Sequence, residues 1–165
     1  MTDAEIQAAF EQHKDAVYRF AWRMSGSASA AEDITQDAFM GLLRHPDRFN
    51  PARGSLRAFL LGIARNMALK RWRFDHRHEP LDDDAMVPAP VDLDRGAIGD
   101  VVGRAVQALV PLQREVVILV EYEGLTLAEV ALAVDADVGT VKSRLHRARE
   151  NLRRTLAPLR SPQPT

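Results

Sequence analysis

The sequence contains no cysteine, which excludes disulfide bonds, thiolate chemistry and cysteine-based zinc sites within the chain. Of the five histidines, His76 and His78 lie close together, but no pair of carboxylates near them completes a metal site. We interpret their segment as a solvated loop, and we expect the chain to bind no metal and no cofactor.

Long apolar runs are also missing. The longest one spans Val116 to Val120, far short of the roughly 20 residues that a helix needs to cross a bilayer. The chain starts without the pattern of a signal peptide, so we expect a cytoplasmic protein without membrane insertion. Its 165 residues, 46% hydrophobic and 27% charged, suit one ordinary globular domain or two small ones.

Charge is nearly balanced over the whole chain but strongly segregated along it. The net charge of −1 predicts no nucleic-acid binding by itself. However, an acidic segment at 82–100 separates two basic segments, at 65–77 and at 140–154. The average therefore hides two basic blocks joined by an acidic bridge.

The first part of the chain has the three-to-four spacing of apolar residues that is typical of helices packed on one face. A first helix ends at Ser25-Gly26, and a second begins at Ser29, where Ser29 and Glu32 are predicted to form a capping box. The buried face of this second helix is Ile34, Ala38 and Leu42, and the polar stripe opposite is Asp33, Gln36, Asp37, Met40 and Arg44. A solvated face is the default interpretation of that stripe.

A loop with two prolines and a glycine, between Pro46 and Gly54, precedes a third helix that begins at Ser55. The predicted buried stripe of this helix is Leu56, Phe59, Leu60, Ile63, Ala64 and Met67. Its outer side becomes basic toward the C-terminal end, which predicts a cationic surface there.

Helical periodicity disappears between residues 79 and 100, where prolines and acids give the composition of a linker. We therefore expect a first domain at 1–78, an acidic linker at 79–100 and a second domain at 101–160. In the second domain the apolar spacing is again helical, with one helix opened by Pro111 and ended at Glu123-Gly124. The predicted fold is all-α, with two small helical domains joined by a flexible acidic linker.

The second domain contains a helix-turn-helix pattern. Thr126 and Glu129 form a capping box, Asp135-Ala136-Asp137 makes the turn, and Asp137 is placed to cap the next helix. The predicted buried side of that helix is Val138, Val141, Leu145, Ala148 and Leu152. Its outer side offers donors for guanine edges and phosphates, namely Lys142, Ser143, Arg144, His146, Arg147 and Arg149. The alternative is a basic helix that is merely solvated.

These residues carry a resemblance to a known family. The segments EGLTLAEVA (123–131) and VGTVKSRLHRAR (138–149) resemble region 4 of extracytoplasmic-function (ECF) sigma factors. AAEDITQDAF (30–39) and LLGIARNMA (60–68) resemble region 2 of the same family, so the likeness spans residues 10–156. One departure is Asp135, at a turn where the family often has glycine. Aspartate tolerates a left-handed backbone better than most residues, so we expect slight strain and an intact fold.

The resemblance implies a factor that binds core RNA polymerase, recognises two promoter elements and helps to open the duplex, without being an enzyme. Residues that would read the −35 element are Lys142, Ser143, Arg144, His146 and Arg147. Residues that would contact the melted −10 element are Asn50, Arg53, Arg65, Asn66, Lys70, Arg71 and Arg73. Residues that would dock on the clamp of the polymerase β′ subunit are Asp33, Gln36, Asp37 and Met40. Trp72 would either stack on a base or anchor the domain core.

The resemblance also implies roles for the linker and for a partner. Asp82, Asp83 and Asp84 would lie near the path of RNA in the polymerase, where negative charge imitates a nucleic-acid backbone. An anti-sigma protein is expected to cover or separate the two DNA-binding domains. The rivals are a helix-turn-helix repressor or response regulator, which shares only the second domain's motif, and a small helical enzyme, for which no nucleophile or phosphate-binding loop is evident.

Overall fold

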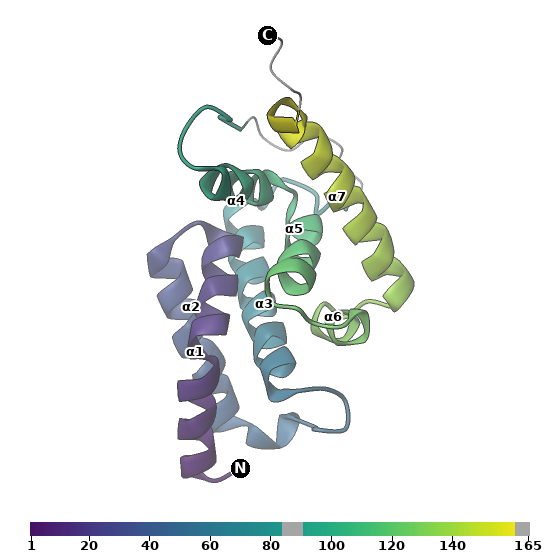
Figure 1. Cartoon of the computed structure of the whole chain (residues 1–165). Helices are drawn as coiled ribbons and strands as arrows, with labels where there is room; N and C mark the ends of the chain where they lie inside the picture. The colour runs from purple at the N-terminus through teal and green to yellow at the C-terminus, as the bar shows by residue number, and fades with distance from the viewer. Residues whose placement is uncertain (84–90, 161–165) are drawn as a thin grey trace.

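A computed structural model describes residues 1–83 and 91–160, and all regular secondary structure in these ranges is helical. The N-terminal unit consists of α1 (Asp3–Ser25), α2 (Ala28–Arg44) and α3 (Leu56–Asp75), with a short 3₁₀ turn, η1 (Pro46–Arg48), before α3. The three long helices pack side by side (Figure 1). The prediction of an all-α fold is confirmed.

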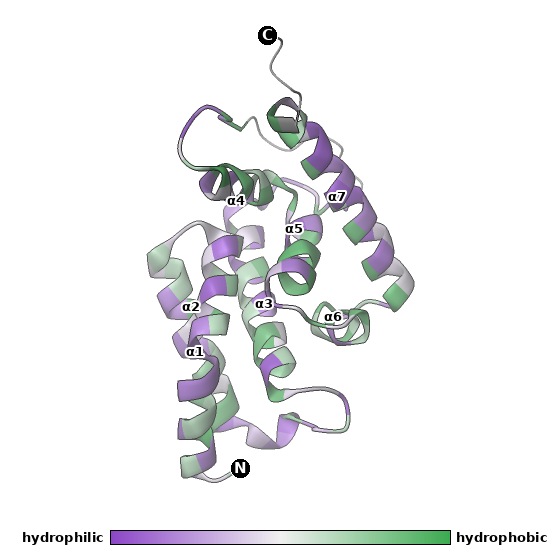
Figure 2. Cartoon of the chain, in the orientation of Figure 1, coloured by the Kyte–Doolittle hydropathy of each residue, from purple (hydrophilic) through white to green (hydrophobic). Residues whose placement is uncertain are grey.

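The C-terminal unit consists of α4 (Ile98–Ala108), α5 (Pro111–Val117), α6 (Leu127–Ala133) and α7 (Val138–Arg160). A π-helical turn, η2 (Ile118–Tyr122), continues α5. Apart from Arg114, every residue of α5 is buried, because α7 and the N-terminal unit both pack against it. Figure 2 shows the difference in character, with α5 mostly hydrophobic and α7 rich in hydrophilic residues.

Capping determines where the N-terminal helices begin. The hydroxyl of Ser27 accepts a hydrogen bond from the backbone N–H of Ala30 at 3.1 Å, so Ser27 caps α2. The predicted capping box at Ser29 is therefore wrong by two residues, since Ser29 already lies within the first turn of α2. Ser55 caps α3 as predicted, with its hydroxyl 3.1 Å from the backbone nitrogen of Ala58.

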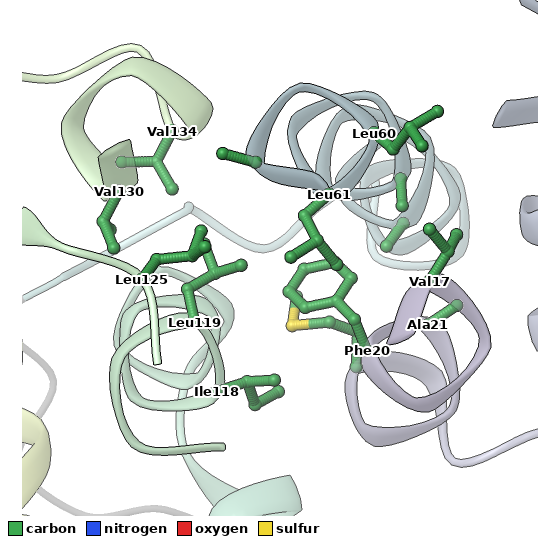
Figure 3. Packing of buried hydrophobic residues seen from close by; sticks show 14 of the residues in the cluster. Val17, Phe20, Ala21, Leu60, Leu61, Ile118, Leu119, Leu125, Val130 and Val134 are labelled. Atoms are coloured by element: carbon green, nitrogen blue, oxygen red, sulfur yellow. The ribbon is translucent and has the colours of Figure 1, made fainter. Parts of the chain in front are cut away.

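Helix α3 buries residues on more than the one face that the sequence predicted. Leu60 and Ala64 of the predicted stripe are fully buried, but so are Leu61 and Leu69 outside it. Figure 3 shows Leu60 on the side of α3 that faces α1. Leu61 points toward Phe20 of α1 and toward the apolar side chains of the C-terminal unit. The single-face prediction was incomplete because it treated each domain alone, whereas α3 lies between two packing partners.

The two units share one continuous hydrophobic core. Helix α3 contacts α6, and α1 contacts α4, α5 and η2. Gly62 of α3 faces Ala133 of α6 so closely that a Cβ on Gly62 would lie 3.3 Å from the Ala133 Cα and 3.6 Å from its Cβ. The sequence left the placement of the two domains open, and the structure packs them against each other. Within the described ranges, the helices are all too short or too polar to cross a membrane.

Candidate nucleic-acid interface

The helix-turn-helix is formed by α6 and α7, with the caps that the sequence predicted. The Thr126 hydroxyl accepts from the Glu129 backbone N–H at 3.1 Å, and the Glu129 carboxylate accepts from the Thr126 backbone N–H at 3.2 Å. The Asp137 carboxylate accepts from the Thr140 backbone N–H at 2.7 Å, which lowers the pKa of Asp137 and caps α7. Asp135 has a φ of 52°, the left-handed conformation expected of it at the turn. These contacts fix the angle between the two helices.

The outer side of α7 is polar and accessible. Lys142, Ser143 and His146 are exposed, whereas Arg144 and Arg147 are partly buried. On the inner side, the predicted residues from Val141 to Ala148 are buried, but Val138 is 38% exposed. The prediction that Val138 is buried is wrong, because this residue directly follows the cap and precedes the first turn that packs inward.

The acidic linker contacts this helix. The Asp83 carboxylate accepts from Nε of Arg144 at 3.2 Å, and the Asp83 carbonyl accepts from Nε2 of Gln113 at 2.9 Å. Gln113 is fully buried in α5, and its Oε1 accepts from Nδ2 of Asn151 in α7 at 2.7 Å. The linker is therefore attached to α5 and to one of the predicted −35 residues. Asp84 lies outside the described residues.

A cleft of about 340 Å³ lies beside the loop that connects η1 to α3. Three of the predicted −10 residues line it: Asn50, Arg53 and Asn66. The Asn50 side chain also accepts from the backbone N–H of Ala52 at 3.0 Å, which shapes the loop. Amide and guanidinium groups around one cleft are the chemistry that receives a base removed from its stack.

Helix α6 of the C-terminal unit forms the opposite wall of this cleft. Glu129, Leu132 and Ala133 line it from that side. The Ser55 hydroxyl at the start of α3 donates to Oε2 of Glu129 at 3.0 Å. The cleft is thus shared between the loop of one unit and the helix-turn-helix of the other.

Arg65 does not line the cleft and is buried, with 9% of its surface exposed, and its Nη1 donates to Oδ1 of the cleft residue Asn66 at 3.3 Å. Its Nε and Nη2 donate to the two carboxylate oxygens of Glu115 in α5 at 2.6 and 2.9 Å. Burial raises the pKa of Glu115, although the hydrogen bonds and charge of Arg65 oppose that change. Arg65, which the sequence predicted to contact the −10 element, is covered by α5 in this arrangement.

The remaining predicted −10 residues, Lys70, Arg71 and Arg73, are exposed at the C-terminal end of α3. Arg71 donates to the carboxylate of Asp33 in α2 at 3.1 Å. The Trp72 ring next to them stacks on His76, with ring centroids 4.4 Å apart and planes 8° from parallel. The predicted −10 residues therefore form three groups. One group lines the cleft, a second lies exposed at the C-terminal end of α3, and the third is Arg65, which is buried with Glu115.

The predicted polymerase-binding residues of α2 are all exposed, but they face two different surroundings. Gln36 and Met40 line an apolar groove of about 570 Å³ between α1 and α2. Asp33 and Asp37 lie nearer α3, where Asp33 pairs with Arg71 and Asp37 lines a hollow that Arg71 also lines. The stripe therefore has an apolar half and an acidic half.

The sequence reading missed two buried acids of the C-terminal unit, Glu115 and Glu123. Oε2 of Glu123 accepts from Arg57 of α3 at 2.9 Å and from Arg19 of α1 at 3.4 Å. One signal was available in the sequence. Glu115 immediately precedes the longest apolar run, where an acid without a partner would be costly to bury.

Comparison with known proteins identifies the family. The models of Sigma-70 region 2 and of Sigma-70, region 4 match residues 9–78 and 100–152. SigL, an ECF RNA polymerase sigma factor of Mycobacterium tuberculosis, is 32% identical over 94% of this chain and 91% of its own length. The chain belongs to the ECF RNA polymerase sigma factors. The ECF sigma factor SigE of Mycolicibacterium smegmatis is 36% identical over 88% of this chain, which spans 59% of the length of SigE.

Solved structures share the fold of this sigma factor across both units. RpoE of Bartonella quintana, solved in complex with the anti-sigma factor NepR, matches with a TM-score of 0.71 and 26% identity. That match covers 93% of this chain and 97% of RpoE. CnrH, solved with the cytosolic domain of CnrY, also matches with a TM-score of 0.71, at 23% identity, over 95% of this chain and 90% of CnrH.

Proposed function

We propose that this sigma factor binds core RNA polymerase and directs transcription initiation at promoters that it reads at two points. The observation that carries the proposal is the capped helix-turn-helix, because its outer side presents donors suited to guanine and phosphate. Helix α7 enters the major groove of the −35 element. The residues that contact bases and phosphates there are Lys142, Ser143, Arg144, His146 and Arg147.

The −10 element binds to the N-terminal unit as a single strand. Asn50, Arg53 and Asn66 receive a base in the cleft beside the loop, since the three side chains line it together. The exposed cations at the end of α3 follow the strand backbone. These cations are Lys70, Arg71 and Arg73, and Arg65 joins them when it is released from Glu115.

The polymerase clamp in the β′ subunit docks on α2. The apolar half of the stripe, Gln36 and Met40, packs against it, while Asp33 and Asp37 pair with basic groups of the clamp. Residues 1–78 and 101–160 thus act as the two DNA-binding domains, and the acidic linker at 79–100 lies near the path of RNA. This sigma factor acts in the cytoplasm by binding alone, and the polymerase carries out the reaction.

An anti-sigma factor controls its activity. RpoE, which shares the fold over 93% of this chain, was solved in complex with an anti-sigma factor, and this supports a partner of the same kind here. Purification from the host under non-inducing conditions should yield a stoichiometric inhibitor. Recovery of the sigma factor alone under these conditions would count against such a partner.

Run-off transcription tests the main proposal. Core polymerase mixed with this chain should initiate from fragments of a genomic promoter library without another sigma factor. Binding to the fragments without initiation would instead indicate a helix-turn-helix repressor.

A substitution tests the −35 assignment. Arg147→Ala should weaken promoter binding by about 1–3 kcal/mol and relax the preference at one base pair. Arg154→Ala removes the same charge from the same helix but lies outside the predicted set, so the sequence preference should persist. An unchanged footprint and preference for Arg147→Ala would refute the assignment.

A further inference from the structure

A salt bridge joins the acidic linker to α7. The Asp83 carboxylate accepts from Nε of Arg144 at 3.2 Å, and the two side chains are 30% and 14% exposed. Arg144 belongs to the residues proposed above to contact the −35 element, whereas Asp83 belongs to no set proposed for promoter DNA. The pair therefore connects a linker acid directly to the helix that enters the major groove.

The backbone of Asp83 is held in place by buried polar side chains. Its carbonyl accepts from Nε2 of Gln113 at 2.9 Å, and Oε1 of Gln113 accepts from Nδ2 of Asn151 at 2.7 Å. Gln113 in α5 is fully buried, and Asn151 in α7 is 3% exposed. Such bonds are kept because breaking one leaves a desolvated polar group unpaired. The hydrogen bonds thus run from Asn151 through α5 to the linker, and return to α7 at Arg144, about two turns away.

The bond from Asp83 engages the guanidinium of Arg144 at one nitrogen. Asp83 accepts from Nε, whereas Glu115 accepts from both Nε and Nη2 of Arg65. A guanidinium that is held at Nε retains the edge formed by its two terminal nitrogens for a further acceptor. That edge binds guanine or phosphate through two parallel hydrogen bonds. Asp83 therefore fixes Arg144 without occupying the edge that DNA would use.

The charge of Arg144 acts near the end of α7 that enters the groove. The side chains of a helix tilt toward its N-terminus. Hydrogen bonds from Thr140 lower the pKa of Asp137, the residue that caps α7, and the positive charge of Arg144 adds to this effect. In helix-turn-helix proteins, the first turns of the second helix supply the base contacts. Arg144 is therefore held where a contact with DNA is made.

We propose that Asp83 is a positioning residue for −35 recognition, because it holds the guanidinium of Arg144 in the orientation that receives DNA. This inference rests on the promoter-binding function proposed above. A side chain that is fixed before DNA arrives loses less entropy on binding. The linker thus contributes to reading of the −35 element through Arg144, a role beyond the one that the resemblance implies for the linker acids.

The sign of the effect separates positioning from simple repulsion. A carboxylate near DNA repels phosphates, so its removal would strengthen binding if repulsion were its main effect. Loss of the fixed orientation of Arg144 has the opposite sign and weakens binding. Because the charge of Asp83 is compensated by Arg144 itself, the loss of orientation should be the larger of the two.

The affinity of the holoenzyme for promoter DNA tests the proposal. Core polymerase is loaded with the wild-type or the Asp83→Ala chain, and binding is measured by fluorescence anisotropy. The first fragment is a promoter selected by run-off transcription with the wild-type protein, and the second is the same promoter with its −35 element replaced. The quantity compared is the preference, defined as the ratio of the two affinities.

Asp83→Ala should lower the preference about twofold to tenfold, the range expected when one flexible side chain loses its fixed orientation. Its affinity for the fragment with the replaced element should match that of the wild type, which shows that the variant is folded and bound to polymerase. The carbonyl bond to Gln113 does not involve the substituted side chain, so the linker stays attached. An unchanged or higher preference would overturn the proposal.

Two further substitutions in the linker serve as controls. Asp94→Ala removes an exposed acid from the same linker and should leave the preference unchanged. Asp83→Asn keeps an oxygen that can accept from Nε of Arg144, so it should retain most of the preference. If either variant lowers the preference as far as Asp83→Ala does, the effect comes from linker charge, and the positioning role is refuted.

A double variant tests whether Asp83 acts through Arg144. Arg144→Ala should lower the preference further than Asp83→Ala does, because it removes the contact itself. Asp83→Ala added to Arg144→Ala should then change nothing more. Additive losses would show that Asp83 acts independently of Arg144 and would overturn the proposal.

The two levels of proposal fail in different ways. If the wild-type chain does not initiate with core polymerase, the proposed function is refuted. If it initiates and Asp83→Ala keeps the wild-type preference, the function stands and the positioning role of Asp83 is refuted.

Discussion

Asp135 combines an exposed position with a left-handed backbone, at a φ of 52°. A β-branched side chain clashes with the backbone in this conformation, so Asp135→Val should lower the free energy of unfolding by about 1–2 kcal/mol. Asp135→Gly is the matched control and should avoid this loss. Urea denaturation of the two variants measures the difference. Equal midpoints would show that the turn can change its conformation.

His13 should make stability depend on pH. Partial burial, and next the positive charge of Arg57, lower the pKa of His13 from 6.5. Just below pH 6.5 the unfolded chain therefore binds more protons at this residue than the folded chain does. The contribution of His13 to the free energy of unfolding falls as the pH decreases through 6.5 toward the folded pKa, and it is constant well above 6.5. Denaturation of wild type and His13→Asn across this window should show a steeper rise of the free energy of unfolding with pH in the wild type than in the variant.

At the scale of elements, the start of α2 offers a sharp comparison between two neighbouring serines. Ser27→Ala removes the hydroxyl that caps the helix and should cost about 0.5–2 kcal/mol of unfolding free energy. Ser29→Ala changes an exposed residue within the first turn and should cost nothing, since alanine is the better helix former. Thermal or urea unfolding decides between them. A larger loss of unfolding free energy for Ser29→Ala than for Ser27→Ala would indicate that Ser29 caps the helix, as the sequence predicted.

Sequence periodicity predicted the helices because apolar spacing and caps are local properties. The capping box at Thr126 and the cap at Asp137 formed where local chemistry placed them. The two buried faces of α3 and the partner of Arg65 could not be predicted in the same way. They depend on contacts between residues about 50 positions apart, such as Arg65 and Glu115, and no local pattern encodes that pairing. For the same reason, the −10 residues appeared in the sequence as one set and in the structure as three groups.

At the scale of the whole molecule, the shared core predicts that the two units unfold together. Tryptophan fluorescence reports on the N-terminal unit, because both tryptophans, Trp22 and Trp72, lie there. Circular dichroism of the helices reports on both units. The two signals should therefore give coincident unfolding curves in urea. Leu61→Ala, which removes a buried side chain between the units, should separate the curves. Separate curves in the wild type would mean that the units are independent in solution.

The π-helical turn at η2 has a consequence for how this family varies. The backbone N–H of Glu123 donates to the Ile118 carbonyl five residues earlier, at 3.0 Å, so the turn holds one residue more than an α-helix would. One residue rotates everything after it by about 100° around the helix axis. Loss of a single residue from 118–122 would leave the helix-turn-helix intact and turn Glu123 away from Arg57 and Arg19. Relatives with a one-residue gap at this point of an alignment should therefore lack the contacts of Glu123 with Arg57 and Arg19. The insertion of that residue would then mark where in the family these contacts first appeared.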